Sequence, residues 1–297
     1  MILYNFIKRC YDDSLKILRK LFRFLISFYN EYLLPSLGLG KNIKMGEGSY
    51  ISGKSRISCN RLGSINIRKK VMLKNATIRV GENSTLVIGD HCNLDNVYLL
   101  VTDGSMVTIG DDATIQRTTI IVQNEGSFRT ESGCILKSSF DARLDNGSLI
   151  FGSKSYSSAR FHVRFGGKIK VGSNTGIGSG TWVRCEEEIT IGDYCLISYD
   201  CLIFDTNTHS TDWKKRRDRI EAGYPNGTTE IEKENPKPIS IGNDVWIGAR
   251  SIILKDTCIG NRTIVGMGTS VSGNIPKDSI VVSTKPRVII KDDMRVG

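Results

Sequence analysis

The sequence is short of the residues that mark several common classes of protein. It has 6 prolines in 297 residues, so its glycine-rich stretches are not a proline-rich linker. Its 3 histidines, His91, His162 and His209, are too far apart in the chain to predict the three-histidine zinc site of a β-helix metalloenzyme. No Cys-x-x-Cys or mixed cysteine–histidine spacing occurs either. The sequence therefore predicts no metal site.

The 8 cysteines do not form the disulfide framework of a secreted protein. Cys92, Cys195 and Cys201 occupy a position that is small in other repeats, as expected for small buried hydrophobes in a reducing cytosol. The net charge of +10 indicates an anionic partner, either a phosphate-rich cofactor, an anionic membrane surface or nucleic acid. No nucleic-acid-binding motif occurs, so nucleic acid is not predicted.

Residues 1–37 lack the glycines of the later repeats and have helical spacing. We expect an amphipathic helix from about Asp13 to Leu34 that ends before Pro35. Arg23 and Glu31 interrupt the apolar residues, so a membrane-spanning helix is not expected. A signal peptide is not expected, because no small-residue cleavage site follows. Two interpretations stay open: a helix that caps the next domain or packs between subunits, and a helix that lies on an anionic membrane surface.

The dominant feature of the chain is a period of six. Every sixth residue is β-branched and apolar in the series Ile241, Ile247, Ile253, Ile259, Val265 and Val271. Glycine follows four of the six, and the position four residues further on is mostly small. A period of six matches neither the 3.6 residues of a helical turn nor the alternation of a simple strand. Unbroken six-residue repeats predict a parallel β-helix.

Similar units of the form apolar–Gly–polar recur upstream at Met45, Val80, Ile88, Ile109, Val171 and Ile191, with a weaker one at Phe151. The interval is 21 residues from Ile88 to Ile109 and 18 from Ile241 to Ile259. We therefore expect one solenoid of about ten turns over 41–275. Its turns are irregular in 41–167 and regular in 168–290.

A polar insertion, residues 206–238, interrupts the six-residue repeats beside the most regular turns. A loop of this length in a compact repeat protein is functional or disordered, and its position favours function. His209 lies at its start, whereas His91 lies at a surface corner. His162 shares a polar strand face with Arg160 and Arg164, which is either a solvated surface or a site for an anionic glycan.

The segments VWIGARSIILKDTCIGNRTIVGMGTSV (245–271) and FDTNTHSTDWKKRRD (204–218) resemble the hexapeptide-repeat acyltransferases. The particular similarity, over roughly 168–290, is to sugar O-acetyltransferases of the maltose, galactoside and capsule type. The resemblance implies a left-handed β-helix, a homotrimer and acetyl-CoA as co-substrate, with no metal. It also implies acetyl transfer to a hydroxyl of a surface polysaccharide, such as capsule or lipopolysaccharide, or of its lipid-linked precursor. The expected location is the cytoplasm, with the inner face of the membrane as the alternative.

The resemblance also assigns roles to residues. His209 would be the general base that takes the proton of the acceptor hydroxyl. Asp205 would orient His209, as carboxylates do for catalytic imidazoles. Asn207 stands where many relatives carry a second aspartate, so this chain departs from a two-carboxylate arrangement. The backbone N–H of Ala249 would stabilise the oxyanion of the tetrahedral intermediate.

Residues of the last turns would hold the cofactor. They are Trp246, Gly248, Ala249, Gly266, Met267, Ser272, Lys285 and Arg287. Trp246 is interpreted either as a wall of this site or as a corner residue that packs between subunits. Trp213 and Arg216, in the insertion, would contact the acceptor.

Two other functions remain open at this stage. One is N-acetylation of an amino sugar on a nucleotide carrier, which the same fold supports. The other is a non-catalytic β-helix that serves as a scaffold or binding module. The insertion that carries His209 argues against a scaffold, which has no need to interrupt its best turns.

Overall fold

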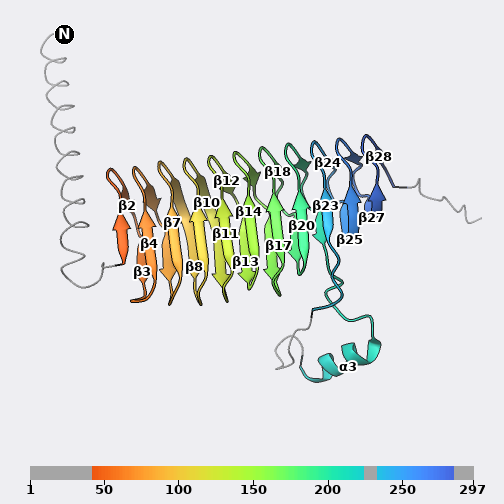
Figure 1. Cartoon of the computed structure of the whole chain (residues 1–297), viewed down its shortest axis with the longest axis horizontal. Coiled ribbons are helices and arrows are strands. Elements are labelled where there is room, and N and C mark those ends of the chain that lie inside the picture. Colours follow the sequence, from red (N-terminus) through yellow and green to blue (C-terminus); the bar gives the residue numbers. More distant parts are fainter. Residues whose placement is uncertain (1–41, 224–232, 284–297) are drawn as a thin grey trace, which may run out of the picture.

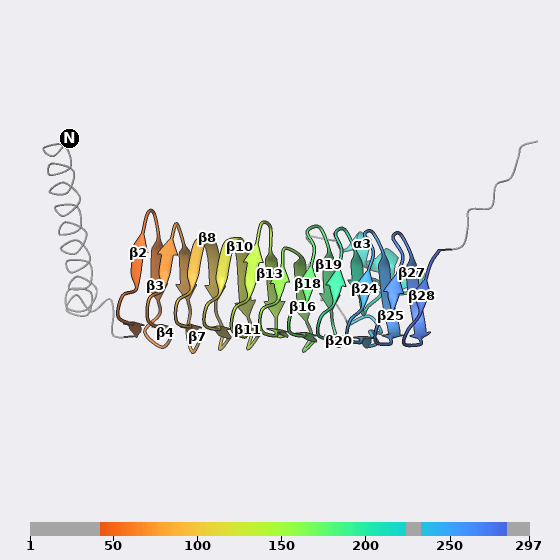
Figure 2. The same cartoon turned by 90° about the horizontal axis from the view of Figure 1, so that it is seen from above.

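The computed structural model describes residues 42–223 and 233–283, which form one rod of stacked coils (Figures 1 and 2). Neighbouring coils pair in parallel along the rod, and each coil contributes strands to three faces. The predicted parallel β-helix of about ten turns is confirmed, and its left hand remains what the resemblance implies. The amphipathic helix expected in residues 1–37 lies outside the described residues.

Strand pairing defines the three faces. The first face contains β1 (Ile43–Met45), β4 (Ser64–Ile67), β7 (Thr85–Ile88), β9 (Met106–Ile109), β11 (Ser127–Thr130), β14 (Ser148–Phe151), β17 (Lys168–Val171), β20 (Glu188–Ile191) and β23 (Ile239–Ile241). The second contains β2 (Tyr50–Ser52), β5 (Met72–Lys74), β12 (Ile135–Lys137), β15 (Tyr156–Ser157), β18 (Gly176–Ile177), β21 (Leu196–Ile197), β24 (Trp246–Ile247), β26 (Ile264–Val265) and β28 (Ile280–Val281). The third contains β3 (Arg56–Cys59), β6 (Thr77–Val80), β13 (Asp141–Asp145), β16 (Arg160–Arg164), β19 (Trp182–Cys185) and β22 (Leu202–Phe204).

Four longer strands bend from one face to the next. β8 (Asn93–Val101) and β10 (Thr114–Gln123) run from the second face to the third. β25 (Ile252–Ile259) and β27 (Ser270–Ile275) run from the third face to the first.

The core consists of columns of side chains that occupy the same place in successive coils. Ile88 pairs in register with Ile109, and Ile241 pairs with Ile259. All four side chains are buried. The sequence intervals of 21 and 18 residues therefore each correspond to one full coil. Val80 belongs to a different column from these residues, because it lies on the third face, opposite Val101.

The glycine and the polar residue of each repeat have separate roles at the corners. A Cβ atom on Gly110 would lie 2.5 Å from the backbone of Glu131 in the next coil, so only glycine allows this approach. The side chain of Asp193 accepts a hydrogen bond from the Ser173 N–H (2.7 Å). Asn243 accepts one in the same way from the Asp193 N–H (2.9 Å). The carboxylate or amide thus satisfies a backbone donor of the preceding coil.

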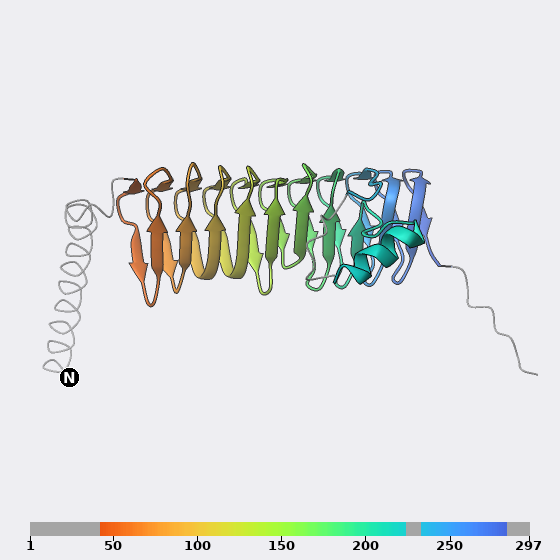
Figure 3. The ribbon, with the colours of Figure 1, turned by 90° about the horizontal axis from the view of Figure 1, so that it is seen from below.

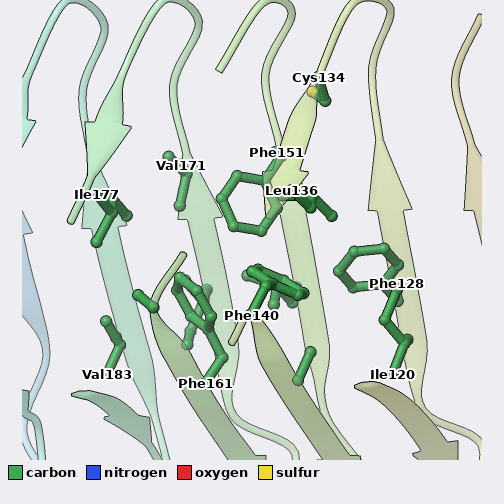
Figure 4. Close-up of a cluster of buried hydrophobic side chains, with 14 of the residues drawn as sticks. Ile120, Phe128, Cys134, Leu136, Phe140, Phe151, Phe161, Val171, Ile177 and Val183 are labelled. Carbon is green, nitrogen blue, oxygen red and sulfur yellow. The ribbon is translucent and has the colours of Figure 1, made fainter. Parts of the chain in front are cut away.

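The wider coils of the N-terminal half enclose aromatic side chains. Phe128, Phe140, Phe151 and Phe161 are all buried and follow one another along the rod (Figure 4). The ring of Phe151 lies 5.4 Å from that of Phe161 and 5.9 Å from that of Phe140, in edge-to-face contacts. Such contacts stabilise aromatic pairs beyond the burial of their area. Small residues pair in register with two of the rings, Thr130 with Phe151 and Ala142 with Phe161.

The insertion contains a helix that the sequence analysis did not predict, α3 (Trp213–Glu221). Figure 1 shows the insertion leaving one edge of the rod near β23 and holding α3 away from the coils, so α3 lies in front of the C-terminal coils in Figure 3, which is seen from below. Asp212 caps the helix by accepting the Lys214 N–H (2.9 Å). Gly223 follows it with φ +89°, so both ends carry ordinary sequence signals. Within 42–223 and 233–283, no helix has the length and apolar character needed to cross a membrane.

Candidate active site

Buried hydrogen bonds join the start of the insertion to the preceding coil. Asp205, directly after β22, is fully buried. Its carboxylate accepts hydrogen bonds from the N–H groups of Glu186 (2.9 Å) and Glu187 (2.8 Å). Its carbonyl accepts the Lys237 N–H (2.8 Å), which joins the returning chain to the departing one. Burial raises the pKa of Asp205, and the two N–H groups oppose that rise. Its expected role in orienting His209 stays a prediction, beside this observed role as an anchor.

A buried carboxylate beside this anchor organises the base of the insertion. Glu186 is fully buried and accepts hydrogen bonds from Arg164 (2.7 Å) and Thr206 (2.9 Å). Arg184 donates to the same carboxylate at 3.3 Å. Burial alone would raise the pKa of Glu186, but these hydrogen bonds and positive charges outweigh it, so its pKa lies below the usual value.

Glu186 was not among the expected site residues, because nothing local distinguishes it from the glutamates that follow. It opens a run of glutamates, 186–188, just ahead of a repeat unit. Glu187 and Glu188 are exposed, and only Glu186 turns toward the base of the insertion. A third-face arginine in each of the two coils, Arg164 and Arg184, supplies the opposite charge.

This network reaches the residue next to His209. Thr208 has φ +65°, which is a strained conformation for a β-branched residue. Its N–H donates to the Thr206 hydroxyl oxygen (3.2 Å), and that hydroxyl donates to Glu186. The strained turn is therefore held from a fully buried carboxylate. Strain of this kind is common at functional sites. His209 follows on the exposed side of the turn.

Helix α3 carries the two expected acceptor contacts on an exposed surface. Trp213 is exposed, and the Arg217 guanidinium lies over its ring at 5.0 Å. Arg216 is also exposed and donates a hydrogen bond to the Ser210 carbonyl (2.8 Å). Arg216 thus joins the helix to the segment that follows His209. Binding of an acceptor by Trp213 and Arg216 stays a prediction.

The corner at Ala249 has a backbone donor that no described residue satisfies. Gly248 lets two coils approach closely, because a Cβ there would lie 2.6 Å from the Met267 nitrogen. The N–H groups of Gly248 and Arg250 on either side of Ala249 both donate to neighbouring coils. Across the part of the chain that the structure describes, nothing accepts the Ala249 N–H. The equivalent donors at the Asp193 and Asn243 corner are capped by side chains.

The structure does not bring His209 and Ala249 to one corner of a single chain. The insertion with His209 joins β22 on the third face to β23 on the first. Ala249 lies at the corner between β24 on the second face and β25 on the third. These are two different edges of the rod, so one copy of the chain does not assemble the base and the oxyanion donor by itself.

The second face of the C-terminal coils exposes a column of large apolar side chains. Leu196 (57% exposed), Trp246 (49%) and Ile280 (71%) point outward, with Ile264 between the last two. Met267, at the corner next to this face, is 74% exposed. An exposed apolar strip of this kind marks an interaction surface on a soluble protein. The strip lies beside Ala249 and includes two of the expected cofactor residues, Trp246 and Met267.

The polar side chains around His162 on the third face are engaged with neighbouring residues. Arg164 is engaged with Glu186, and Arg160 lies over the ring of Trp182 at 5.5 Å. His162 packs edge-to-face on Trp182 (5.5 Å). Burial lowers the pKa of His162 to about 4, so this imidazole is neutral near pH 7. These contacts make the face a packed surface around Arg160, His162 and Arg164, and a site for an anionic glycan stays a prediction.

The remaining expected cofactor residues divide between described and undescribed parts of the chain. Ser272 is exposed on β27, and Gly266 is half-buried next to Val282. Lys285 and Arg287 lie outside the described residues.

Within 42–223 and 233–283, no three His, Cys, Asp or Glu side chains are grouped so as to bind a metal ion. The described Cys92, Cys195 and Cys201 are free, buried thiols, and burial raises the pKa of each.

The fold and the interrupted ladder define a parallel β-helix of six-residue repeats, and comparison with known proteins agrees. Residues 238–273 match the family described as bacterial transferase hexapeptide (six repeats). The putative lipopolysaccharide biosynthesis O-acetyl transferase WbbJ of Escherichia coli K12 is 28% identical over 149 residues, which are 50% of this chain and 74% of WbbJ. The galactoside O-acetyltransferase of the same organism is 26% identical over 128 residues, 43% of this chain and 56% of that enzyme.

Among solved structures, the hexapeptide-repeat acetyltransferase VCA0836 of Vibrio cholerae, complexed with acetyl coenzyme A, is 29% identical. The match covers 47% of this chain and 67% of that one, with a TM-score of 0.36. The chain therefore resembles the hexapeptide-repeat acyltransferases, by its repeats over residues 238–273 and by its sequence relatives. The alignment with WbbJ leaves half of this chain unmatched.

Proposed function

We propose that the protein is an acetyl-CoA-dependent O-acetyltransferase that acts on a sugar hydroxyl of a surface polysaccharide or its lipid-linked precursor. The observation that carries the proposal is the strained Thr208 turn, which is held by the buried Glu186 and presents His209. Among the described non-glycine residues with positive φ, Thr208 is the only β-branched one, and strain of this kind next to an exposed imidazole suits a catalytic turn. The similarity to WbbJ and to the galactoside enzyme, both named as O-acetyltransferases, supports acetyl transfer to an oxygen acceptor.

In the proposed reaction, His209 in its neutral form takes the proton of the acceptor hydroxyl as that oxygen attacks the thioester carbonyl. The carbonyl π electrons move to oxygen, and the resulting oxyanion is stabilised by the Ala249 N–H. When the carbonyl re-forms, the C–S bond breaks and the CoA thiolate leaves. The proton held by His209 then returns to that sulfur. No covalent intermediate with the enzyme is required.

The active unit in this proposal is a homotrimer. His209 and Ala249 lie at different edges of one chain, so a second copy must supply one of them. The apolar strip of Leu196, Trp246 and Ile280 supports a subunit contact beside Ala249. A closed ring of three identical copies would give three equivalent sites and leave no unpaired surface. Acetyl-CoA would lie at this contact, along Gly248, Gly266, Met267 and Ser272, with Lys285 and Arg287 on its phosphates.

The acceptor would enter past the insertion, where Trp213 and Arg216 lie on the exposed surface of α3. We propose a cytoplasmic protein that works at the inner face of the membrane, where lipid-linked glycans are built. An amino-sugar acceptor would use the same proton transfer, so the linkage formed is part of the test.

The proposal is tested by incubating the purified protein with labelled acetyl-CoA and a panel of glycans, followed by mass spectrometry. We expect one acetyl group on a sugar oxygen, removable by mild base, and release of one free CoA thiol per transfer. Transfer to an amino sugar through a base-stable amide would contradict the O-acetyl assignment. Absence of transfer to every glycan, with no binding of acetyl-CoA, would contradict the enzymatic function.

The trimer is tested separately by sedimentation. A Leu196→Glu variant introduces a charge into the apolar strip and should sediment as a monomer without transferase activity. Lys170→Glu, on the exposed first face, is the matched control and should stay trimeric. A fully active monomeric wild type would overturn the shared site.

A further inference from the structure

The positive charge of the protein is concentrated at one end of the rod. Residues 42–80 contain nine lysines and arginines and one acidic residue, Glu47, a net charge of +8. The rest of the described chain has 21 basic and 23 acidic residues, a net charge of −2. The nine basic residues, here called the basic end, are Lys44, Lys54, Arg56, Arg61, Arg68, Lys69, Lys70, Lys74 and Arg79.

The basic end surrounds the rod, and three of its residues, Lys44, Arg68 and Lys69, line an open pocket beside β1 and β4. The nine residues of the basic end are all exposed and come from all three faces, as with Lys44 on β1, Lys74 on β5 and Arg56 on β3. They belong to the first two coils, at the end of the rod that carries β2 to β4 in Figure 2. Within the described residues, one of the nine makes an ion pair, Arg68 with Asp111 at 3.6 Å. Most of this charge is therefore open to an external partner.

An exposed apolar side chain lies among these charges. Leu62 is 64% exposed, next to Arg61, at the corner between β3 and β4. Basic residues with an exposed leucine among them suit the boundary between lipid headgroups and acyl chains. A single-stranded nucleic acid would call for aromatic stacking surfaces, and 42–80 contain a single aromatic residue, Tyr50.

We propose that the basic end docks the rod end-on against an anionic phospholipid bilayer. A flat layer of lipid phosphates can contact basic residues from all three faces of the rod end at the same time. A narrow polymer would contact only a few of them. β6 at this end and β22 at the candidate active site are six strand spacings apart, about 30 Å along the rod. Docking would thus hold the active site away from the headgroups, within reach of a glycan that extends from its lipid.

The test measures sedimentation of the full-length protein with two kinds of vesicle. One kind is phosphatidylcholine alone, and the other is phosphatidylcholine mixed with phosphatidylglycerol. We expect binding to the anionic vesicles only. The binding should weaken as salt is raised, because the screening length falls to about 8 Å at physiological ionic strength. Equal binding to neutral vesicles would overturn an electrostatic dock.

Matched charge reversals locate the surface. The variant Lys69→Glu/Lys70→Glu/Lys74→Glu should bind anionic vesicles at least about 100-fold more weakly, since each basic residue near such a surface contributes about fivefold. The control Lys154→Glu/Lys168→Glu/Lys170→Glu makes the same charge change at exposed positions in the middle of the rod. Lys70 and Lys154 also share a left-handed corner, with φ of 55° and 57°.

Three results would overturn the proposal. The first is equal weakening in the two triple variants, which would mean that net charge alone controls binding. The second is unchanged binding of the first variant, which would locate the contact elsewhere, residues 1–37 included. The third is retention of duplex DNA as tightly as of vesicles. Acetyl transfer to a soluble acceptor should be the same in both variants, so failure of the dock is distinguishable from failure of the proposed enzyme function.

Discussion

The two halves of the rod share one pattern of paired strands but differ in the side chains that fill their cores. Between Ile88 and Ile109 a coil takes 21 residues, and its neighbours enclose phenyl rings. Between Ile241 and Ile259 a coil takes 18, and small residues such as Ser251 and Thr263 fill the corners, each donating its hydroxyl to a carbonyl of the next coil. The two halves thus differ in coil length and in core side chains, while the paired columns stay in register.

The difference has a consequence for function. Backbones approach closely in both halves, at Gly110 and at Gly248, and in the narrow half the Ala249 N–H is left uncapped at such a corner. The wide coils carry no such corner in the candidate site, and the first two of them carry the excess charge. Chemistry and docking are therefore assigned to opposite ends of one rigid body.

The largest effect is expected at His209, the proposed catalytic base. His209→Ala should lower kcat by about 10²–10⁴-fold, because a general base contributes that much. Binding of acetyl-CoA, measured by calorimetry, should change little, since the proton belongs to the acceptor. His91→Ala, an exposed histidine of the wide half, is the control and should be fully active. Wild-type turnover by His209→Ala would remove the main reason for the proposed mechanism.

The next effect sharpens the contrast between the two cores. Phe151→Ala should destabilise the protein by about 3–5 kcal/mol, because the three phenyl rings around it cannot collapse into the space left. Ile253→Val, a buried position of the narrow half, should cost only about 0.5–1.5 kcal/mol. Urea unfolding of both variants measures the difference. Equal losses would mean that the aromatic column adds nothing to the wide coils.

A smaller effect is expected from the link between the buried network and the catalytic turn. Thr206→Val removes the hydroxyl that donates to Glu186 and accepts the Thr208 N–H. We expect kcat to fall roughly tenfold, in line with one lost hydrogen bond. The KM for acetyl-CoA should stay unchanged, and Thr206→Ser should restore the rate. A loss that serine does not restore would point to packing of the Thr206 methyl group and away from positioning.

The smallest effect concerns pH and the third face. The pKa of His162 is lowered by burial to about 4, so the unfolded chain takes up this proton first as pH falls. The free energy of unfolding should therefore decrease between about pH 6.5 and 4, and a His162→Gln variant should lose part of that decrease. Urea unfolding at several pH values measures it. An identical pH dependence in the variant would contradict the buried, neutral imidazole.

Much of the fold and part of the site could be read from the chain alone. The six-residue period predicts the solenoid, its three columns and the 21- and 18-residue coils, because a stacked core demands the same kind of residue at each return. The same period marks 206–238 as an interruption and so draws attention to His209. The residue types at Gly110 and Asp193 also have local physical reasons. Gly110 allows two backbones to approach closely, and Asp193 accepts a hydrogen bond from a backbone N–H.

Contacts between distant coils could not be read in this way. Glu186 meets Arg164 and Thr206 across about 20 positions of sequence, and nothing in the local pattern distinguishes it from Glu187. The separation of His209 and Ala249 onto different edges of the rod follows from which face each strand joins. Local spacing determined how this chain coils. Only the stacking of the coils decided which side chains are buried together and which functional groups a single copy keeps apart.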